Sequence, residues 1–165
     1  MARAVLAAGT LHGEYYGATD SSGQILGFIL AIPPGRDLFS TEVERELGFN
    51  EFMDKLSDAG KEYFKTTYTN KFHELVEESL GPKGNLKSFW IYMVMVRPEY
   101  QRKGIARALM GLLREKASSL GHPVALSTTN PNNVVVYQKM GFVLKGQAIM
   151  PSPWADWPIY VLSTS

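Results

Sequence analysis

Hydrophobic and polar positions change their period along the chain, and these changes predict its parts. Residues Glu14 to Thr19 and Gln24 to Ile32 are rich in strand-forming residues. The turn sequence Asp20-Ser21-Ser22-Gly23 separates them, so the two segments are expected to pair as an antiparallel hairpin. Before the hairpin, Ala2 to Ala8 predicts a short apolar helix closed by Gly9.

Between residues 36 and 88 the apolar positions recur at helical spacing among many charges, which predicts a helical insert of two or three helices. The expected helices span Thr41 to Leu47 with Ser40 as N-cap, Phe49 to Ser57, and Lys61 to Leu80. An aromatic stripe on the last helix, Phe64, Tyr68 and Phe72, is expected to pack on the sheet as core; the alternative is a lid over a substrate.

After the insert, strand and helix patterns alternate. Residues Phe89 to Val96 form an apolar run typical of a strand covered on both faces. The elements expected to follow are a helix ending at Gly121, a strand at Val124 to Thr129, a helix that Asn130 caps and that closes at Gly141, and strands at Phe142 to Met150 and Trp157 to Leu162. A strand-helix-strand unit implies parallel pairing, so the fold class predicted is α/β, a mixed sheet with a parallel pair at its centre.

Composition narrows the function classes. The 165 residues predict one domain, residues 1–165. Lys and Arg total 17 against 16 acidic residues, a balance that argues against nucleic acid or an anionic membrane as partner. Cysteine is absent and the three histidines occur singly, so the sequence predicts no metal site. Without a signal peptide or long apolar run, the expected location is intracellular, by default cytoplasmic.

The stretch from Val94 to Leu109 predicts a phosphate site. A buried strand stops at Pro98, passes through a polar turn and becomes a helix within a few residues. The leading N–H groups of a helix have no intrahelical acceptor and attract anions. Gly104 allows close approach to the backbone, and Arg102 and Lys103 add positive charge. On this stretch alone, an ordinary strand-to-helix connection explains the pattern equally well.

The same residues resemble the GNAT superfamily of acetyl-CoA-dependent N-acetyltransferases. That family's pyrophosphate signature is Gln or Arg, two variable residues, Gly, one variable residue, then Gly or Ala; Gln101, Gly104 and Ala106 occupy the specified places. Residues Asn130 to Phe142 are similar to the family's second cofactor motif. The likeness covers Glu14 to Ser163 in outline and is sharp from Phe89 to Phe142.

The resemblance implies a GNAT-like sheet, mostly antiparallel around its central parallel pair, and a role for each matching residue. The backbone near Val94 and Val96 would pair with the pantetheine arm of acetyl-CoA. Asn130 and Asn133 would lie beside that arm, and Tyr137 would protonate the departing thiolate. Capping alone also explains Asn130, and packing alone is the alternative for Tyr137. The residues implied to surround the diphosphate are Gln101, Arg102, Lys103, Gly104, Ile105 and Ala106.

Two departures from the family stand out. Its N-terminal strand and helices are not matched in this sequence. Either the chain is a shortened form, or another segment or the second subunit of a homodimer is expected to supply part of the acceptor wall. The insert at residues 36–88 is longer than the usual connection. No general base is identified either: Tyr92, Glu99 and Asp156 are candidates, and none is favoured.

The predicted function is transfer of acetyl from acetyl-CoA, as acyl-donor cosubstrate, to a primary amine of a small molecule or peptide. Direct attack in a ternary complex is expected because the chain has no Cys and no Ser-His-acid arrangement. The alternative is an acyl-CoA-binding module that is catalytically impaired or truncated.

Overall fold

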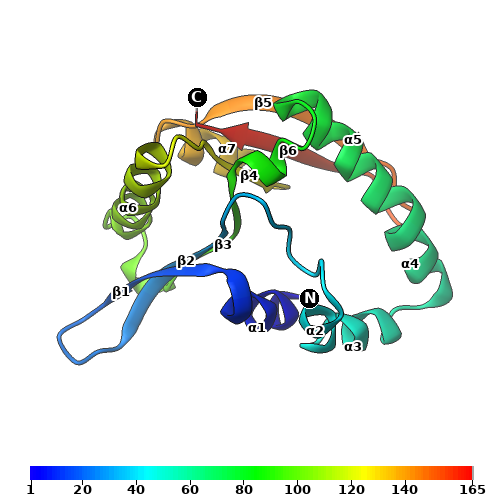
Figure 1. Cartoon of the computed structure of the whole chain (residues 1–165), viewed down its shortest axis with the longest axis horizontal. Helices are drawn as coiled ribbons and strands as arrows, with labels where there is room; N and C mark the ends of the chain where they lie inside the picture. Colours follow the sequence, from blue (N-terminus) through cyan, green and yellow to red (C-terminus); the bar gives the residue numbers. More distant parts are fainter. Residues whose placement is uncertain (165) are drawn as a thin grey trace.

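A computed structural model describes residues 1–164, which fold around one six-stranded sheet (Figure 1). The strand order is β1-β2-β3-β4-β6-β5, and β3–β4 is its parallel pair. The strands are β1 Glu14–Thr19, β2 Ile25–Ile32, β3 Phe89–Val96, β4 Val124–Thr128, β5 Val143–Met150 and β6 Trp157–Ser163. The predicted fold class is therefore confirmed: the sheet is mixed, mostly antiparallel, and has its parallel pair at the centre.

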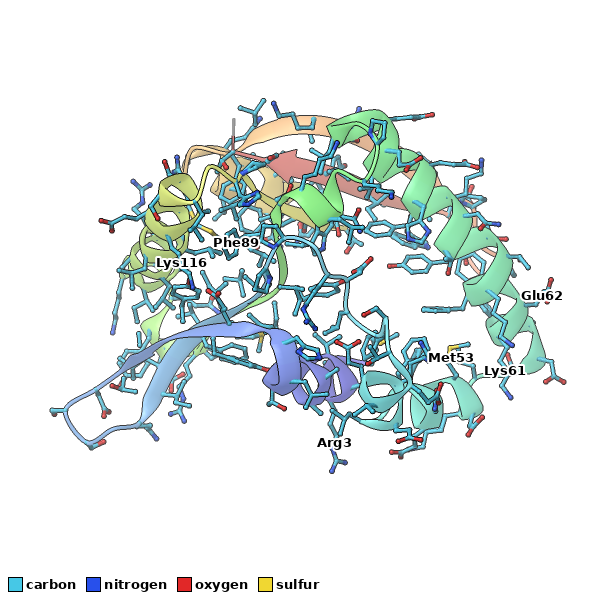
Figure 2. All side chains as sticks on the ribbon, viewed as in Figure 1. Arg3, Met53, Lys61, Glu62, Phe89 and Lys116 are labelled. Atoms are coloured by element: carbon cyan, nitrogen blue, oxygen red, sulfur yellow. The ribbon has the colours of Figure 1, made fainter. Side chains whose placement is uncertain are left out.

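Helices cover both faces of this sheet. On one face lie α6 (Ile105–Ser119) and α7 (Pro131–Gln138), whose apolar residues pack on Phe89, Ile91 and Leu126. Figure 2 shows Phe89 on the side that faces α6. On the other face, α1 (Ala2–His12) packs on β2, and α5 (Thr69–Leu80) packs on β5 and β6. The two helices on this second face stand over different halves of the sheet, which leaves β3 between them (Figure 1).

The helical insert consists of α2 (Glu42–Glu46), α3 (Phe49–Asp54) and one long bent helix. The long helix comprises α4 (Asp58–Glu62), the π segment η1 (Tyr63–Tyr68) and α5. Figure 2 shows Met53 and Lys61 at the far end of the insert, where the chain passes from α3 to α4. Short 3-10 turns, η2 (Asn85–Lys87) and η3 (Pro98–Tyr100), flank β3.

The expected helices differ from the structure at several ends. The helix expected over Phe49 to Ser57 ends at Asp54, and Ser57 instead caps α4, which begins three residues before the expected start at Lys61. Thr41, not Ser40, is the N-cap of α2: its hydroxyl accepts from the Glu44 N–H at 3.3 Å while the Glu44 carboxylate accepts from the Thr41 N–H at 2.9 Å. This reciprocal capping box satisfies two donors, whereas a lone Ser40 cap would satisfy one. At the N-terminus, α1 continues through Gly9 to His12, because a Cβ at Gly9 would collide with Leu30 and glycine lets the helix lie close to β2.

The central strand changes character at Tyr92. Ala31 pairs with Ile91 and Leu30 with Met93, so Tyr92 is the extra residue of a β-bulge. The parallel pairing of β3 with β4 also stops here, since its last pair is Ile91 with Leu126. Beyond this point the two central strands are no longer hydrogen-bonded to each other. A bulge can re-aim a side chain beside a site, and this one coincides with the gap between the strands.

No helix among residues 1–164 is both long and apolar enough to cross a membrane.

Candidate functional site

A cavity of about 510 Å³ opens beside the gap on the α6 and α7 face. Its walls come from the end of β3, the loop before α6, the start of α6 and one side of α7. The predicted residues that line it are Val94, Val96, Gln101, Arg102, Gly104, Ile105, Ala106, Asn133 and Tyr137. We call it the donor cavity. The structure thus brings most of the predicted cofactor residues, and the predicted acid, around one space.

The loop before α6 exposes backbone donors. Ala108 is the residue whose N–H bonds back to the Gly104 carbonyl, at 2.9 Å, so the N–H groups from Ile105 to Arg107 have no intrahelical acceptor. Gly104 is the N-cap with φ of 84°, and a Cβ built there would meet no atom within 4 Å. Glycine is therefore suited to this position by its backbone conformation, and the space above it is open to a ligand.

Two side chains shape the same loop. The Gln101 amide donates from Nε2 to the Val96 carbonyl at 3.1 Å, which ties the loop to the end of β3. Arg102 has φ of 61°, in the left-handed region that non-glycine residues adopt at a cost of about 1 kcal/mol. A glycine at this position would adopt the same backbone conformation without this cost. Here an arginine keeps its positive charge next to the unpaired N–H groups of α6.

Tyr137 is held in the donor cavity by packing. Its ring meets Phe142 edge-on at 5.8 Å between centroids, and it is half-buried against the α6 and α7 core. Burial raises the pKa of the Tyr137 phenol, so the hydroxyl keeps its proton at neutral pH. A protonated phenol beside the cavity is in the correct form to act as a general acid.

Two predicted cofactor residues do not line the donor cavity. The Lys103 ammonium lies over the Tyr100 ring, 4.9 Å from its centroid. Asn130 is the N-cap of α7, and its Oδ1 accepts from the Asn132 N–H at 2.9 Å. Asn133, by contrast, lines the cavity and donates to the Thr128 hydroxyl at 3.3 Å.

Of the predicted base candidates, Tyr92 alone lies at the gap between the central strands. Glu99 stands 3.8 Å from Arg97 at the surface, and Asp156 accepts from the Ser152 N–H in the β5–β6 loop. The Tyr92 hydroxyl instead donates to Asp37, a residue that sequence reasoning missed. Its contact with Tyr92 spans 55 residues, so no local pattern could have indicated it. Burial and the neighbouring Asp37 carboxylate raise the pKa of Tyr92 well above its usual value.

A second cavity, of about 460 Å³, opens on the opposite face of the sheet, between α1 and the insert. We call it the aromatic cavity. Its lining includes Trp90 and Tyr92 from β3, Ser127 from β4 and Asp37 from the loop after β2. The aromatic stripe, Phe64, Tyr68 and Phe72, forms much of the remaining wall. Tyr68 and Phe72 pack on the sheet as predicted, and they also face the cavity.

The two cavities meet the gap between β3 and β4 from opposite faces. Val94 reaches the donor cavity, whereas Tyr92 and Ser127 line the aromatic cavity, and all three residues lie just beyond the last β3–β4 pair. The two cavities therefore flank the part of the sheet where β3 and β4 are no longer paired. No cluster of His, Asp and Glu able to hold a metal ion is found among residues 1–164.

Comparison with known proteins gives one family match. Residues 71–144 match the family model described as acetyltransferase (GNAT) domain. No curated protein matches the chain.

Several solved structures share the fold at low sequence identity. The ribosomal-protein-S18-alanine N-acetyltransferase from Escherichia coli is 13% identical with a TM-score of 0.52, covering 93% of this chain and 68% of its own. The Drosophila melanogaster polyamine N-acetyltransferase is 16% identical with a TM-score of 0.54, covering 89% and 72%. A streptothricin acetyltransferase candidate from Bacillus anthracis, solved in complex with acetyl coenzyme A, is 15% identical with a TM-score of 0.54, covering 93% and 62%.

The described chain therefore spans about two thirds of the length of these solved relatives. The matched region contains all the residues that line the donor cavity, from Val94 to Met140. Residues 71–144 thus match an acetyltransferase (GNAT) domain, and solved N-acetyltransferases share the fold of the chain.

Proposed function

We propose that this chain is an N-acetyltransferase that passes acetyl from acetyl-CoA to a primary amine by direct attack in a ternary complex. One observation carries the proposal. The donor cavity joins the freed end of β3, the unpaired N–H groups of α6 and the Tyr137 phenol around one space. These three features match three parts of acetyl-CoA. The strand end suits the pantetheine arm, the unpaired N–H groups suit the diphosphate, and the phenol suits the thioester sulfur.

The residues present suit acetyl-CoA. The amides from Ile105 to Arg107 offer donors to a diphosphate at the positive end of the α6 dipole, and Arg102 adds charge. The unpaired backbone beyond Ile91 on β3 offers strand-like hydrogen bonds to the amides of the pantetheine arm. When bound, acetyl-CoA supplies an activated thioester.

The transfer itself asks two things of the protein. The neutral amine nitrogen attacks the thioester carbonyl carbon, a C–N bond forms, the nitrogen gives a proton to solvent water, and the C–S bond breaks. Tyr137 gives its proton to the departing sulfur and regains one from solvent; its raised pKa means only that the phenol carries this proton at neutral pH. The gap between β3 and β4 lets the amine approach from the face opposite the donor cavity, so binding orients both reactants.

Calorimetry with acetyl-CoA and with desulfo-CoA, which lacks the reactive sulfur, tests the donor site. Both are expected to bind, and no binding at millimolar concentration would refute the proposal. Thiol release across a panel of primary amines then tests transfer. Binding without turnover of any amine would instead favour the CoA-binding module that is catalytically impaired.

A further inference from the structure

The aromatic cavity is lined by a continuous series of rings. Successive ring centroids lie 6.1 Å apart for Trp90 and Phe72, 5.8 Å for Phe72 and Tyr68, and 5.2 Å for Tyr68 and Phe64. The series continues across to α3 and the loop before α2, with 5.8 Å from Phe64 to Phe49 and 4.7 Å from Phe49 to Phe39. All of these rings line the cavity.

The π segment η1 keeps these rings on one side of the long helix. In a regular α-helix, residues four apart drift around the axis because a turn holds 3.6 residues. The wider π turn between Phe64 and Tyr68 offsets that drift, so Phe64, Tyr68 and Phe72 all face the cavity. The Thr69 hydroxyl fixes the widened turn by donating to the Phe64 carbonyl at 2.7 Å. π-bulges are frequent at functional sites, and this one shapes a cavity wall.

One acidic side chain, Asp37, lines the cavity among the described residues. Its Oδ1 accepts from the Tyr92 hydroxyl and from the Leu38 N–H, the latter at 2.9 Å, and its Oδ2 accepts from the Asn85 amide at 3.0 Å. A carboxylate has about four acceptor sites. Three donors from three segments therefore hold Asp37 in place and leave acceptor capacity on Oδ2.

The charge and shape of the cavity indicate the kind of molecule that it holds. An ammonium group can pair with Asp37 and lie near the faces of the surrounding rings. An aromatic or branched apolar body gains by leaving water against the ring series. A polyamine would place further ammonium groups against apolar walls without a second carboxylate, and burying such unpaired charge is costly.

We infer that the aromatic cavity is the acceptor site, and that it selects a primary amine with one positive charge on an aromatic or bulky apolar body. This inference rests on the acetyl-transfer function proposed above. Asp37 holds the ammonium group next to Tyr92 and Ser127, beside the unpaired ends of β3 and β4, and the nitrogen loses a proton to solvent water before it attacks. Phe64 and Phe49 contact the apolar body at the end away from the sheet.

Calorimetry with four small molecules tests the site without requiring turnover. Phenethylamine, butylamine, spermidine and the uncharged 2-phenylethanol are titrated into the protein saturated with desulfo-CoA. Phenethylamine is expected to bind at least tenfold more tightly than each of the others, because it alone combines one charge with a ring. Spermidine binding as tightly as phenethylamine would overturn the inference.

Two variants assign the contacts. Asp37→Asn is expected to weaken the binding of phenethylamine at least tenfold and to leave the binding of 2-phenylethanol unchanged. The matched control is Asp54→Asn, because Asp54 is an exposed aspartate on α3 outside the cavity. Phe64→Leu is expected to weaken the binding of phenethylamine several-fold and to leave the binding of butylamine unchanged. This substitution keeps the Asp37 hydrogen bonds intact. Unchanged phenethylamine affinity in both variants would place the amine elsewhere. Thermal melts confirm that each variant is folded.

Turnover separates this inference from the proposed function. Thiol release with spermidine or a peptide but not with phenethylamine would refute the amine class and leave acetyl transfer standing. Phenethylamine binding that depends on Asp37, without thiol release from acetyl-CoA for any amine, would support the site and refute acetyl transfer.

Discussion

The donor cavity and the aromatic cavity lie on opposite faces of the same two strands, yet they are assembled in different ways. The donor cavity is built from one continuous stretch, Val94 to Met140. The aromatic cavity draws on α1, the loop after β2, three parts of the insert and both central strands. A site made from one stretch leaves a motif in the sequence, whereas a site made from distant segments depends on how those segments pack.

The family match follows the same division. It spans residues 71–144, which includes the whole donor cavity and excludes Asp37, Phe49 and Phe64. The residues that we assign to acceptor selection lie largely outside the matched region. Donor binding and acceptor selection should therefore be separable by mutation, and the following substitutions test that separation in order of decreasing effect.

Gly104→Glu should abolish acetyl-CoA binding, with a loss of more than a hundredfold. The new side chain would enter the open space above the α6 N-terminus, add a negative charge where a diphosphate is expected and force a φ of 84° on a residue with a Cβ. Calorimetry measures the loss. Phenethylamine binding in the aromatic cavity should survive, which distinguishes a donor defect from unfolding.

Gly111→Glu is the matched control for this variant. Gly111 is exposed on the same helix, and a Cβ there would also meet no atom within 4 Å, but it lies outside the donor cavity. If both substitutions weakened acetyl-CoA binding equally, a general effect of negative charge would explain the loss, and a local clash at Gly104 would not.

Tyr137→Phe should lower kcat about a hundredfold, the usual contribution of general acid catalysis, and leave the acetyl-CoA dissociation constant nearly unchanged. The ring keeps its contact with Phe142, so the fold of α7 should hold. Steady-state thiol release and calorimetry measure the two quantities. Tyr160→Phe, in the same core but outside both cavities, is the control, and equal kcat values for the wild type and Tyr137→Phe would remove Tyr137 from the mechanism.

The pH dependence of kcat adds a second check on Tyr137. A general acid must carry its proton, and burial raises the pKa of this phenol above its usual value of about 10. Loss of kcat through Tyr137 ionisation is therefore expected only above about pH 10. An alkaline decrease with a midpoint near pH 8 that disappears in Tyr137→Phe would contradict the assignment.

The sequence predicted most of the fold because the strong signals were local. Some elements are specified by residues that are neighbours in the sequence. Examples are the hairpin turn at Asp20 to Gly23, the Asn130 cap and the apolar strand at Phe89 to Val96. The N-cap of α2 was predicted one residue too early because Ser40 and Thr41 are adjacent and both can cap a helix. Thr41 is the N-cap because its side chain and the Glu44 side chain each accept a hydrogen bond from the other residue's N–H. The end of α1 was predicted too early because Gly9 was interpreted as a helix stop. Gly9 instead lies inside the helix, where a side chain would collide with Leu30.

The candidate site divides along the same line. The turn from Gln101 to Ala106 could be recognised because its glycine and its unpaired amides are consecutive in the chain. Asp37 could not be found, since its partners Tyr92 and Asn85 are 55 and 48 residues away. The bulge that aims Tyr92 at Asp37 arises from pairing with β2, which no pattern within β3 reports.

Glu44→Ala should destabilise the acceptor side and spare the donor side. Glu44 is 1% exposed, and its carboxylate accepts hydrogen bonds from the Thr41 N–H and hydroxyl and from the Ser40 hydroxyl. Removing it takes away the capping-box hydrogen bonds at the start of α2, at a cost of about 1 kcal/mol. Urea unfolding measures the change, with Glu46→Ala, exposed on the same helix, as control. Acetyl-CoA affinity should stay within twofold of the wild-type value.

The Glu44 effect should also depend on pH. Burial acts to raise the pKa of this carboxyl, but the hydrogen bonds from Thr41 and Ser40 outweigh burial and the pKa is lowered. A depressed pKa contributes stability above the unfolded value of about 4.3, and this stability is lost as the pH falls through the folded value. The difference between wild type and Glu44→Ala should therefore shrink below about pH 4. A difference that grew on acidification would contradict this sign.

Arg102 offers the smallest effect and the finest separation, because one residue carries both a charge and a backbone cost. Arg102→Ala removes the charge but keeps a Cβ at a φ of 61°, whereas Arg102→Gly removes both. The glycine variant should be about 1 kcal/mol more stable than the alanine variant in urea unfolding. Both variants should bind acetyl-CoA several-fold more weakly than wild type. Raising the salt concentration should weaken acetyl-CoA binding more in wild type than in either variant, since only the wild type has this charge to screen. Equal stability of the two variants would mean that the loop relaxes out of the left-handed conformation, and unchanged affinity in both would leave the diphosphate to the backbone N–H groups alone.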